Sequence, residues 1–312
     1  MSGNADIRDA FFDEIYDIGA ENKDVIVITA DADAFGLRKF KKDFPGQFIN
    51  AGVAEQNMVD VAAGLALCGK KVFIYAIIPF ITMRCYEHIK ATICSMRLPV
   101  TIVGAGAGLS FGYDGPTHHA VQDIAVMRML PEITILNPCD DVSAAASARF
   151  AYASPTPVYV RIDKGVFPRR YEGSDDFGLG LKVLREIRDV NIIATGFMSH
   201  QAVEVADELK KHSFDVGVID LNRLKPVNET MLLEHTGHSQ RLITLEENSI
   251  IGGIGTIVSE LLTDEKKNIL LKRIALSDKQ HFDYGSREWL HECYRLDVNS
   301  ITETILKELK HA

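Results

Sequence analysis

The feature that most constrains the fold is a series of short apolar runs separated by longer segments with helical spacing. Five of these runs are Val25–Thr29, Leu98–Val103, Pro157–Ile162, Asn191–Gly196 and Arg241–Leu245. Continuous apolar runs bounded by turn residues are typical of strands that are buried on both faces. Because such strands alternate with helices here, the pattern indicates parallel sheets. We therefore expect an α/β protein made of two doubly wound domains.

One segment interrupts this alternation and predicts the domain border. It runs from residue 164 to 180 and is rich in glycine, proline and charged residues. Strand–helix alternation begins again at Asn191, and 312 residues are enough for two substantial cores. The expected domains are residues 1–172 and 181–312.

Composition narrows the class of protein. The formal net charge of −9 argues against electrostatic binding to nucleic acid or to an anionic membrane. No apolar run approaches the roughly 20 residues of a membrane span, and residues 1–6 lack an apolar signal core. The five cysteines are scattered, which favours reduced thiols. We expect a cytoplasmic protein.

The most informative motif is Ile49–Met58, which precedes a small-residue helix expected over Val59–Leu67 and closed by Gly69. Gly52 can form a tight turn, so Glu55 falls in the first turn of a helix. An acidic residue there stabilises the helix dipole. It could equally be a catalytic carboxylate held between strand and helix. The local residues leave both interpretations open.

Further motifs follow in order: Asp114–His118, Val160–Arg161 and Leu245–Asn248. Together with Ile49–Met58, they resemble the thiamine-diphosphate enzymes of the transketolase and 1-deoxyxylulose-5-phosphate synthase type. The resemblance covers nearly the whole chain. It matches only the second half of those enzymes, which comprises the pyrimidine-binding and C-terminal domains.

This resemblance implies cofactor roles for Glu55, Phe80 and Tyr75, and a fourth candidate, Asp31, comes from its position in the chain. In such enzymes a buried glutamate hydrogen-bonds the aminopyrimidine and activates thiamine diphosphate, and Glu55 matches it. That role needs a carboxyl that holds or shares a proton near neutral pH, which apolar surroundings favour. An aromatic side chain stacks on the pyrimidine: Phe80 is the candidate and Tyr75 the alternate. Asp31 follows the first strand, where α/β sheets bind ligands.

The resemblance also implies a substrate site. His118 is expected to act on the sugar and Asp114 to contact a sugar hydroxyl. Arg161 and Arg8 match arginines that bind sugar phosphate, a group that guanidinium recognises well. A packed histidine and surface arginines are the alternatives for these positions.

Two departures from the family pattern are informative. Its phosphate-site serine falls near Phe35 and its histidine within Gly104–Gly108, where neither residue type is present. We therefore expect an acceptor other than the usual sugar phosphate. Gly-Asp-Gly, which binds diphosphate and Mg²⁺ in the family, does not occur. This predicts a split enzyme, with a separate N-terminal subunit that supplies the metal site in a heterotetramer.

Several alternatives remain at this stage. A 1-deoxyxylulose-5-phosphate synthase-like subunit, a 2-oxoacid dehydrogenase β-like subunit and a non-catalytic binding subunit would share the fold. The stretch Gly252–Gly255 at a helix start could hold an anion, although in the resembling enzymes it is mainly structural.

Overall fold

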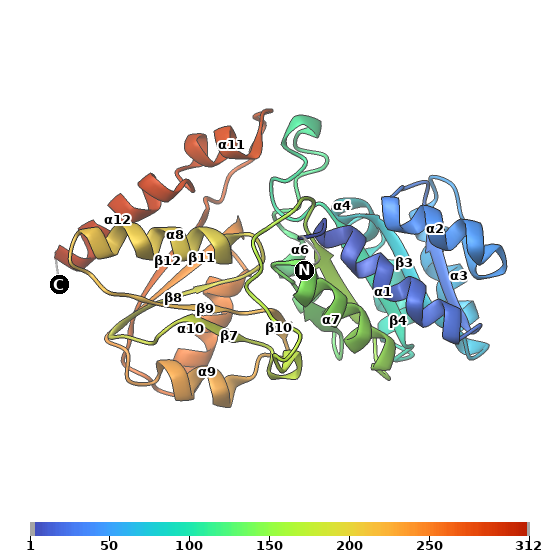
Figure 1. Cartoon of the computed structure of the whole chain (residues 1–312), viewed down its shortest axis with the longest axis horizontal. Helices are drawn as coiled ribbons and strands as arrows, with labels where there is room; N and C mark the ends of the chain where they lie inside the picture. The colour runs from blue at the N-terminus through green and yellow to red at the C-terminus, as the bar shows by residue number, and fades with distance from the viewer. Residues whose placement is uncertain (1–3, 311–312) are drawn as a thin grey trace. The chain divides into compact units, whose positions relative to one another are not determined.

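The computed structural model describes residues 4–310, and it divides the chain into two compact units (Figure 1). The first unit comprises the chain up to Ala107 together with Val126–Gly178. The second comprises Gly108–Ala125 together with the chain from Leu179 onward. Each unit contains its own sheet and its own apolar core.

The strands of the first unit form one parallel sheet. They are β1 (Val25–Thr29), β2 (Phe48–Asn50), β3 (Lys71–Ile77), β4 (Val100–Ala105), β5 (Thr134–Leu136) and β6 (Val158–Ile162). Their order in the sheet is β5-β6-β4-β3-β1-β2, and each neighbouring pair is parallel. The side chains of β1, β4 and β6 are buried throughout, as the continuous apolar runs predict.

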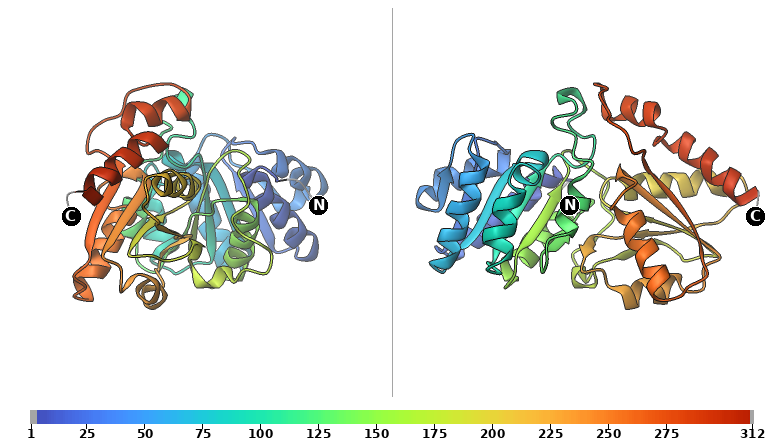
Figure 2. Two further views of the ribbon diagram at one scale, coloured as in Figure 1. Left: turned by 60° about the vertical axis from the view of Figure 1, so that its left-hand side comes forward. Right: turned by 180° about the vertical axis from the view of Figure 1, so that it is seen from behind.

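Helices cover both faces of this sheet (Figures 1 and 2). They are α1 (Ile7–Glu21), α2 (Phe35–Asp43), α3 (Glu55–Leu67), α4 (Ile78–Ile81), α5 (Tyr86–His88) and α7 (Asp141–Ala153), and α6 (Asp123–Arg128) crosses the border between the two units. Phe12 of α1, Phe40 of α2 and Ala144 of α7 share one core with alternate residues of the strands. The strand residues between those alternate ones face the other side of the sheet, where α3 packs through Met58 and Val59.

The spacing of apolar residues predicts a regular amphipathic helix over residues 83–96, but the structure is irregular there. Residues 82–85 form a turn, α5 follows, and Ile89–Cys94 is a π-helix. Within it the Thr92 hydroxyl donates to the His88 carbonyl over 2.6 Å, and the Ser95 hydroxyl donates to the Lys90 carbonyl over 2.7 Å. Hydroxyl groups that bind main-chain carbonyls compete with the regular helical hydrogen bonds. Periodicity alone does not reveal this competition.

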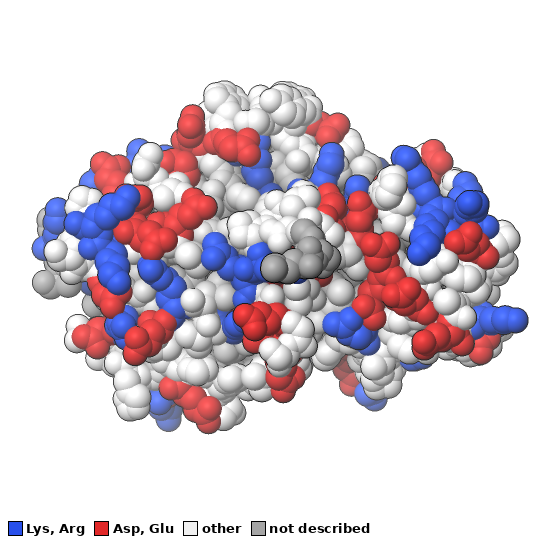
Figure 3. Space-filling view, in the orientation of Figure 1, with Lys and Arg blue, Asp and Glu red and all other residues white. Residues whose placement is uncertain are grey.

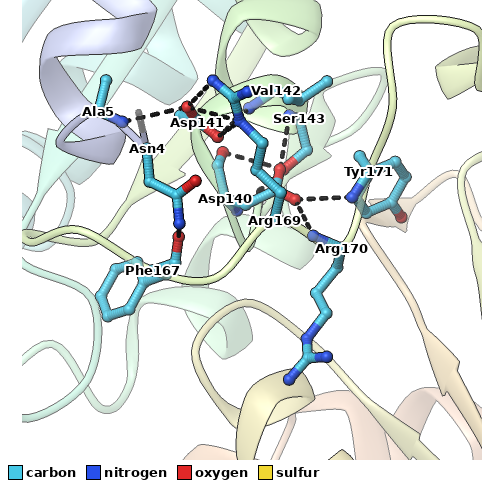
Figure 4. Close-up of polar contacts among 10 residues, drawn as sticks. All are labelled: Asn4, Ala5, Asp140, Asp141, Val142, Ser143, Phe167, Arg169, Arg170 and Tyr171. Atoms are coloured by element: carbon cyan, nitrogen blue, oxygen red, sulfur yellow. Dashed lines mark hydrogen bonds and ion pairs between the residues drawn. The ribbon is translucent and has the colours of Figure 1, made fainter. Parts of the chain in front are cut away.

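A cluster of hydrogen bonds ties the chain after β6 to the start of α7 (Figure 4). Asp140 caps α7 by accepting from the Ser143 N–H over 2.8 Å, and its second oxygen accepts from the Tyr171 N–H over 2.7 Å. Asp141 accepts from Arg169 over 2.6 Å. Although burial opposes the effect, this guanidinium helps to hold the pKa of Asp141 below its usual value. These contacts fix the last segment of the first unit.

The second unit contains a smaller, mixed sheet. Its strands are β7 (Lys182–Arg185), β8 (Val190–Ala194), β9 (Gly217–Asp220), β11 (Arg241–Ser249) and β12 (Leu270–Leu276), with the short β10 (Arg223–Lys225) nearby in the sequence. The order is β12-β11-β8-β9-β7, and only the β7–β9 pair of this sheet is antiparallel. The helices are α8 (Met198–Lys211), α9 (Glu229–Thr236), α10 (Ile254–Asp264), α11 (Arg287–Tyr294) and α12 (Val298–Lys310). Both units thus confirm the predicted α/β fold with mainly parallel sheets.

The segment Gly108–Ala125 groups with the second unit, although the first unit flanks it on both sides in sequence. Leu109 and Val121 are buried in the core that α8 and α12 share. The Ser249 N–H donates to the Val121 carbonyl over 2.7 Å. The domain ranges 1–172 and 181–312 stay a prediction, and the segment Gly108–Ala125 lies within the first of these ranges in sequence.

Within residues 4–310, no helix is both long enough and apolar enough to cross a membrane. The face drawn in Figure 3 carries acidic and basic side chains next to one another.

Candidate active site

Glu55 is held by a glycine turn between β2 and α3. Gly52 adopts φ +69°, and its carbonyl accepts from the Ala54 N–H over 2.7 Å. An added Cβ at Gly52 would meet nothing within 4 Å, so the turn requires glycine for its backbone conformation and not for space. Glu55 is the first residue of α3 and is only 4% exposed. The structure therefore buries this carboxylate at the positive end of a helix.

Asn50 joins this turn to the loop that follows β1. Its side-chain oxygen accepts from the Gly52 N–H over 3.0 Å and from the Asp31 N–H over 3.1 Å. Its amide nitrogen donates to the Asp31 carboxylate over 3.3 Å. Asp31 has φ +58°, a left-handed conformation that Asp tolerates better than most residues. Asp31 and Asn50 line an open pocket of about 550 Å³ in the first unit, together with Thr29 and Lys41.

Arg84 contacts two of the predicted site residues at once. Its Nη1 lies 2.8 Å from Glu55 Oε2, and its Cζ lies 4.1 Å from the centre of the Phe80 ring. Phe80 lies in α4 and is half-buried. Its carbonyl accepts from the Cys85 thiol over 3.2 Å, and burial raises the pKa of that thiol to about 12. Glu55 and Phe80 are thus brought together on either side of one guanidinium.

Tyr75 lies in a different environment. It is 2% exposed and packs edge-on against Phe12 with 4.9 Å between the ring centres. Burial raises the pKa of Tyr75, and the half-buried guanidinium of Arg8 nearby opposes that rise. Of the two aromatic candidates, Phe80 therefore has the more accessible ring and the contact with Glu55's ion-pair partner.

Arg161 is 4% exposed and lies in β6, where it pairs in register with Gly104 of β4. The structure therefore places this arginine within the sheet of the first unit. Glu55, Phe80, Asp31, Arg8 and Arg161 all belong to that unit.

Asp114 and His118 belong to the second unit, in the segment Gly108–Ala125. Asp114 is exposed and ends a short 3₁₀ helix, whereas His118 is half-buried. His118 Nδ1 lies 3.0 Å from the Thr117 hydroxyl, and its ring meets Phe111 edge-on at 6.2 Å. The neighbouring His119 is 3% exposed, and burial lowers its pKa. Of the two histidines, only His118 is accessible enough to reach a substrate.

The motif Leu245–Asn248 lies in β11, and Glu247 forms a buried ion-pair cluster. Arg287 donates from Nε to Oε1 over 2.9 Å and from Nη2 to Oε2, while His291 Nε2 lies 2.5 Å from Oε1. The guanidinium also stacks on Phe197, with 3.8 Å from Cζ to the ring centre. Burial alone would raise the pKa of Glu247, but Arg287 and His291 hold it well below its usual range.

Glu246 accepts hydrogen bonds from the main-chain N–H groups at the start of α10. Its two carboxylate oxygens accept from the N–H groups of Ile254 and Gly255, both over 2.9 Å. A Cβ at Gly253 would lie 1.8 Å from Glu246 Oε2, so this close approach requires glycine. The helix start that could bind an external anion is instead filled by a carboxylate of the chain itself.

Among the residues that the structure describes, no group of three or more His, Cys, Asp or Glu side chains could hold a metal ion. Glu55 pairs with a guanidinium, and Asp31 bonds an amide. The site residues of this chain are suited to an organic ligand that offers a planar ring and N–H donors.

Comparisons with known proteins identify the class. Residues 4–169 match the family described as "Transketolase, pyrimidine binding domain", and residues 180–301 match "Transketolase, C-terminal domain". The chain therefore belongs to the transketolase family of thiamine-diphosphate enzymes and has the two domains of its second half.

Three known proteins locate it within that family. The chain is 33% identical over 306 residues to one of the subunits of apulose-4-phosphate transketolase from Phocaeicola vulgatus, covering 97% of each chain. It is 32% identical to 1-deoxy-D-xylulose-5-phosphate synthase from Caldanaerobacter subterraneus subsp. tengcongensis, covering 99% of this chain but 50% of that one. A solved structure described as "Split gene transketolase, inactive beta4 tetramer" superposes with a TM-score of 0.87 at 32% identity and 99% coverage of both chains. The chain thus corresponds to the second-half subunit of a split transketolase.

Sequence reasoning missed two residues of the site. Asn50 lies inside the motif Ile49–Met58. Its place before a glycine turn was a usable signal, because Asn side chains often accept from N–H groups two residues on. Arg84 lies 29 residues after Glu55 in an irregular turn. No periodicity or spacing marks such a contact in advance.

Proposed function

We propose that this chain is the C-terminal subunit of a split transketolase that transfers a two-carbon ketol unit from a ketose phosphate to an aldehyde acceptor. It works with a separate N-terminal subunit in a heterotetramer, in the cytoplasm. The observation that supports this proposal most directly is the position of Glu55. It is a buried carboxylate at a glycine turn and helix start, and its ion-pair partner Arg84 also contacts the half-buried ring of Phe80. The match over 97% of both chains to a protein named as one subunit of a transketolase supports the division of the enzyme into two chains.

These residues fit the pyrimidine part of thiamine diphosphate. An aromatic face can stack on a planar ring, and a buried carboxylate gains from a ligand N–H or ring nitrogen. We assign Phe80 to stacking and Glu55 to the hydrogen bond at the ring nitrogen, where the carboxyl holds or passes a proton. Asp31 orders the adjacent loop through Asn50, and Tyr75 supports the strand from the core. When bound, thiamine diphosphate supplies the carbanion chemistry that breaks and forms the carbon–carbon bond.

The diphosphate and Mg²⁺ are assigned to the N-terminal subunit. Mg²⁺ takes carboxylate, amide and water oxygens in near-octahedral geometry, and the described residues of this chain offer no such cluster. Two copies of this chain and two of its partner would form the heterotetramer, with self-association through this subunit. The similar solved structure is described as a β4 tetramer, which supports association of second-half subunits.

The substrate residues proposed are His118 and Asp114, with Arg161 and Arg8 for a phosphate group. His118 is accessible and could hydrogen-bond or move a proton at a sugar oxygen. Arg161 is deeply buried and Arg8 is half-buried near Tyr75, so these arginines are less accessible to phosphate than the pattern implied. This agrees with an acceptor other than the usual sugar phosphate. Efficient transfer to ribose 5-phosphate, in a panel of phosphorylated and unphosphorylated aldoses, would contradict it.

A second candidate function is a 1-deoxyxylulose-5-phosphate synthase-like reaction, which the 32% identity to such an enzyme favours. The two activities are distinguished by pyruvate: only the synthase reaction releases CO₂ from it. A 2-oxoacid dehydrogenase β-like role would also consume a 2-oxo acid. A non-catalytic subunit would consume neither pyruvate nor a ketose phosphate.

The testing experiment is calorimetry with thiamine diphosphate and Mg²⁺, on this chain alone and mixed with its N-terminal subunit. We expect binding only in the mixture, followed by transfer from a ketose phosphate. Glu55→Gln should lower the turnover of the mixture by about 10²- to 10⁴-fold, the usual contribution of a positioned acid–base group. The exposed Glu87→Gln is the matched control. Full turnover with Glu55→Gln would refute the role of Glu55, and tight cofactor binding by the isolated chain would refute the division of the site.

A further inference from the structure

Arg84 makes the two contacts that the proposed site offers to the cofactor. Its planar guanidinium lies 4.1 Å from the centre of the Phe80 ring and donates to Glu55 Oε2 over 2.8 Å. A guanidinium is a flat N–C–N unit with N–H donors at its edge. The aminopyrimidine of thiamine diphosphate is also flat and also carries N–H donors beside a ring nitrogen. The same aromatic face and the same carboxylate would recognise both groups.

From these contacts we infer that Arg84 occupies the pyrimidine position in the ligand-free subunit and leaves it when the cofactor binds. This inference rests on the function proposed above. The role of Glu55 there is to hold or share a proton with the ligand, whereas a guanidinium keeps all its protons near neutral pH. Because Arg84 and the cofactor would use the same aromatic ring and the same carboxylate, their binding is competitive.

The exposure of the two side chains makes this exchange feasible. The Arg84 side chain is 43% exposed, so it can turn into solvent with little change in hydration, while the Glu55 side chain is 4% exposed. A buried carboxylate that loses its cation is strongly destabilising. Arg84 thus neutralises Glu55 until a ligand N–H replaces it.

The backbone holds Arg84 in reach of both partners. The Gln56 side-chain amide donates to the Arg84 carbonyl over 3.2 Å, which ties the turn at residues 82–85 to the first turn of α3. The Cys85 thiol bonds the Phe80 carbonyl on the other side. Only the Arg84 side chain needs to move, because its main chain is fixed by these contacts.

The test compares Arg84→Met with the wild type by calorimetry, using thiamine diphosphate with Mg²⁺ and the complete enzyme with its N-terminal subunit. Met keeps an unbranched side chain but is shorter and has no N–H donor, so it cannot compete for Glu55. Since a competing conformation weakens apparent affinity by its own population, we expect the dissociation constant to fall about five-fold. Arg149→Met is the matched control, because Arg149 forms a comparable pair with Glu14 and its side chain is 55% exposed.

Thermal unfolding of the ligand-free chain gives a second readout. Arg84→Met should lower the unfolding temperature more than Arg149→Met does, and a further Glu55→Gln should restore it by removing the unpaired charge. If Arg84→Met does not fold, Arg84→Lys serves instead, since it retains charge but loses the planar stack.

The outcomes separate this inference from the proposed function. If the wild-type enzyme binds no thiamine diphosphate, the proposed function fails and the inference fails with it. If the wild type binds but Arg84→Met binds equally or more weakly, only the inference is overturned, and Arg84 then assists the bound state. Tighter binding by Arg84→Met, without tighter binding by Arg149→Met, supports competition.

Discussion

Three buried glutamates show how the partners of a residue decide its use. Glu246 bonds main-chain N–H groups at a helix start, and Glu247 is enclosed by Arg287 and His291. Glu55 instead meets a half-exposed arginine that can leave. The first two carboxylates have partners fixed within the second unit, whereas the partner of Glu55 is exchangeable. Burial alone therefore does not distinguish a catalytic carboxylate from a structural one.

The Glu247 cluster predicts a specific pH dependence of stability. Glu247→Gln should lower the free energy of unfolding at pH 7 by about 3 kcal/mol, because it leaves the buried Arg287 guanidinium without its anionic partner and removes the carboxylate that contacts His291. The folded-state pKa of Glu247 is depressed. Its stabilising contribution is therefore present above the unfolded value of about 4.3 and is lost as the pH falls towards the folded value.

Denaturant unfolding between pH 7 and pH 3 checks this. The difference in free energy of unfolding between wild type and Glu247→Gln should decrease below about pH 4.3, the ordinary pKa of an unfolded glutamate. Glu303→Gln is the control, because Glu303 forms an exposed pair with Arg295. A difference in free energy of unfolding that stays constant down to pH 3 would contradict the assignment of the charge to Glu247.

At the scale of elements, the start of α10 depends on Glu246. Glu246→Ala removes the acceptor of the Ile254 and Gly255 N–H groups, and we expect a loss of about 1–3 kcal/mol because buried donors are left unpaired. Hydrogen exchange should rise first in the opening turn of α10. Glu265→Ala, at the exposed end of the same helix, is the control. Equal exchange in the two variants would show that the glycine turn holds the helix start without Glu246.

Element prediction succeeded where the apolar pattern was strong and failed where tertiary contacts decide. The strands β1, β4, β6, β8 and β11 follow directly from continuous apolar runs, and α3 follows from the Gly52 turn. The helix α2 was not expected, because it buries only Gly36, Leu37 and Phe40 among several charged residues. The irregular segment after α4 was predicted as a regular helix, and the position of Arg84 was therefore not predicted. Which main-chain carbonyl accepts from a given side-chain hydroxyl is determined only once the chain has folded.

At the scale of the whole molecule, the sequence motifs indicated the family and the division of the enzyme into two chains. They did not indicate which segments belong to which compact unit. The residues of the proposed cofactor site lie in one unit and His118 with Asp114 in the other. The segment Gly108–Ala125 carries no sequence signal for its unit, because Leu109 and Val121 would suit either core. Glu247 likewise finds Arg287 and His291 40 and 44 residues along the chain, a separation that no local pattern encodes.

This grouping makes a prediction about which unit a single core residue stabilises. Leu109 is fully buried in the core of the second unit, although the residues of the first unit surround it in sequence. Leu109→Ala should cost about 2–5 kcal/mol, the usual cost of such a truncation in a core. Hydrogen exchange should rise in β8 and β11 and stay at wild-type values in β1 and β3. Met129→Ala is the control, because Met129 is 78% exposed. Faster exchange in β1 and β3 with unchanged exchange in β8 and β11 would assign the segment to the first unit. The expected pattern would mean that the second unit depends on a segment that lies within the sequence of the first. A fragment beginning at residue 181 would then lack part of its own core.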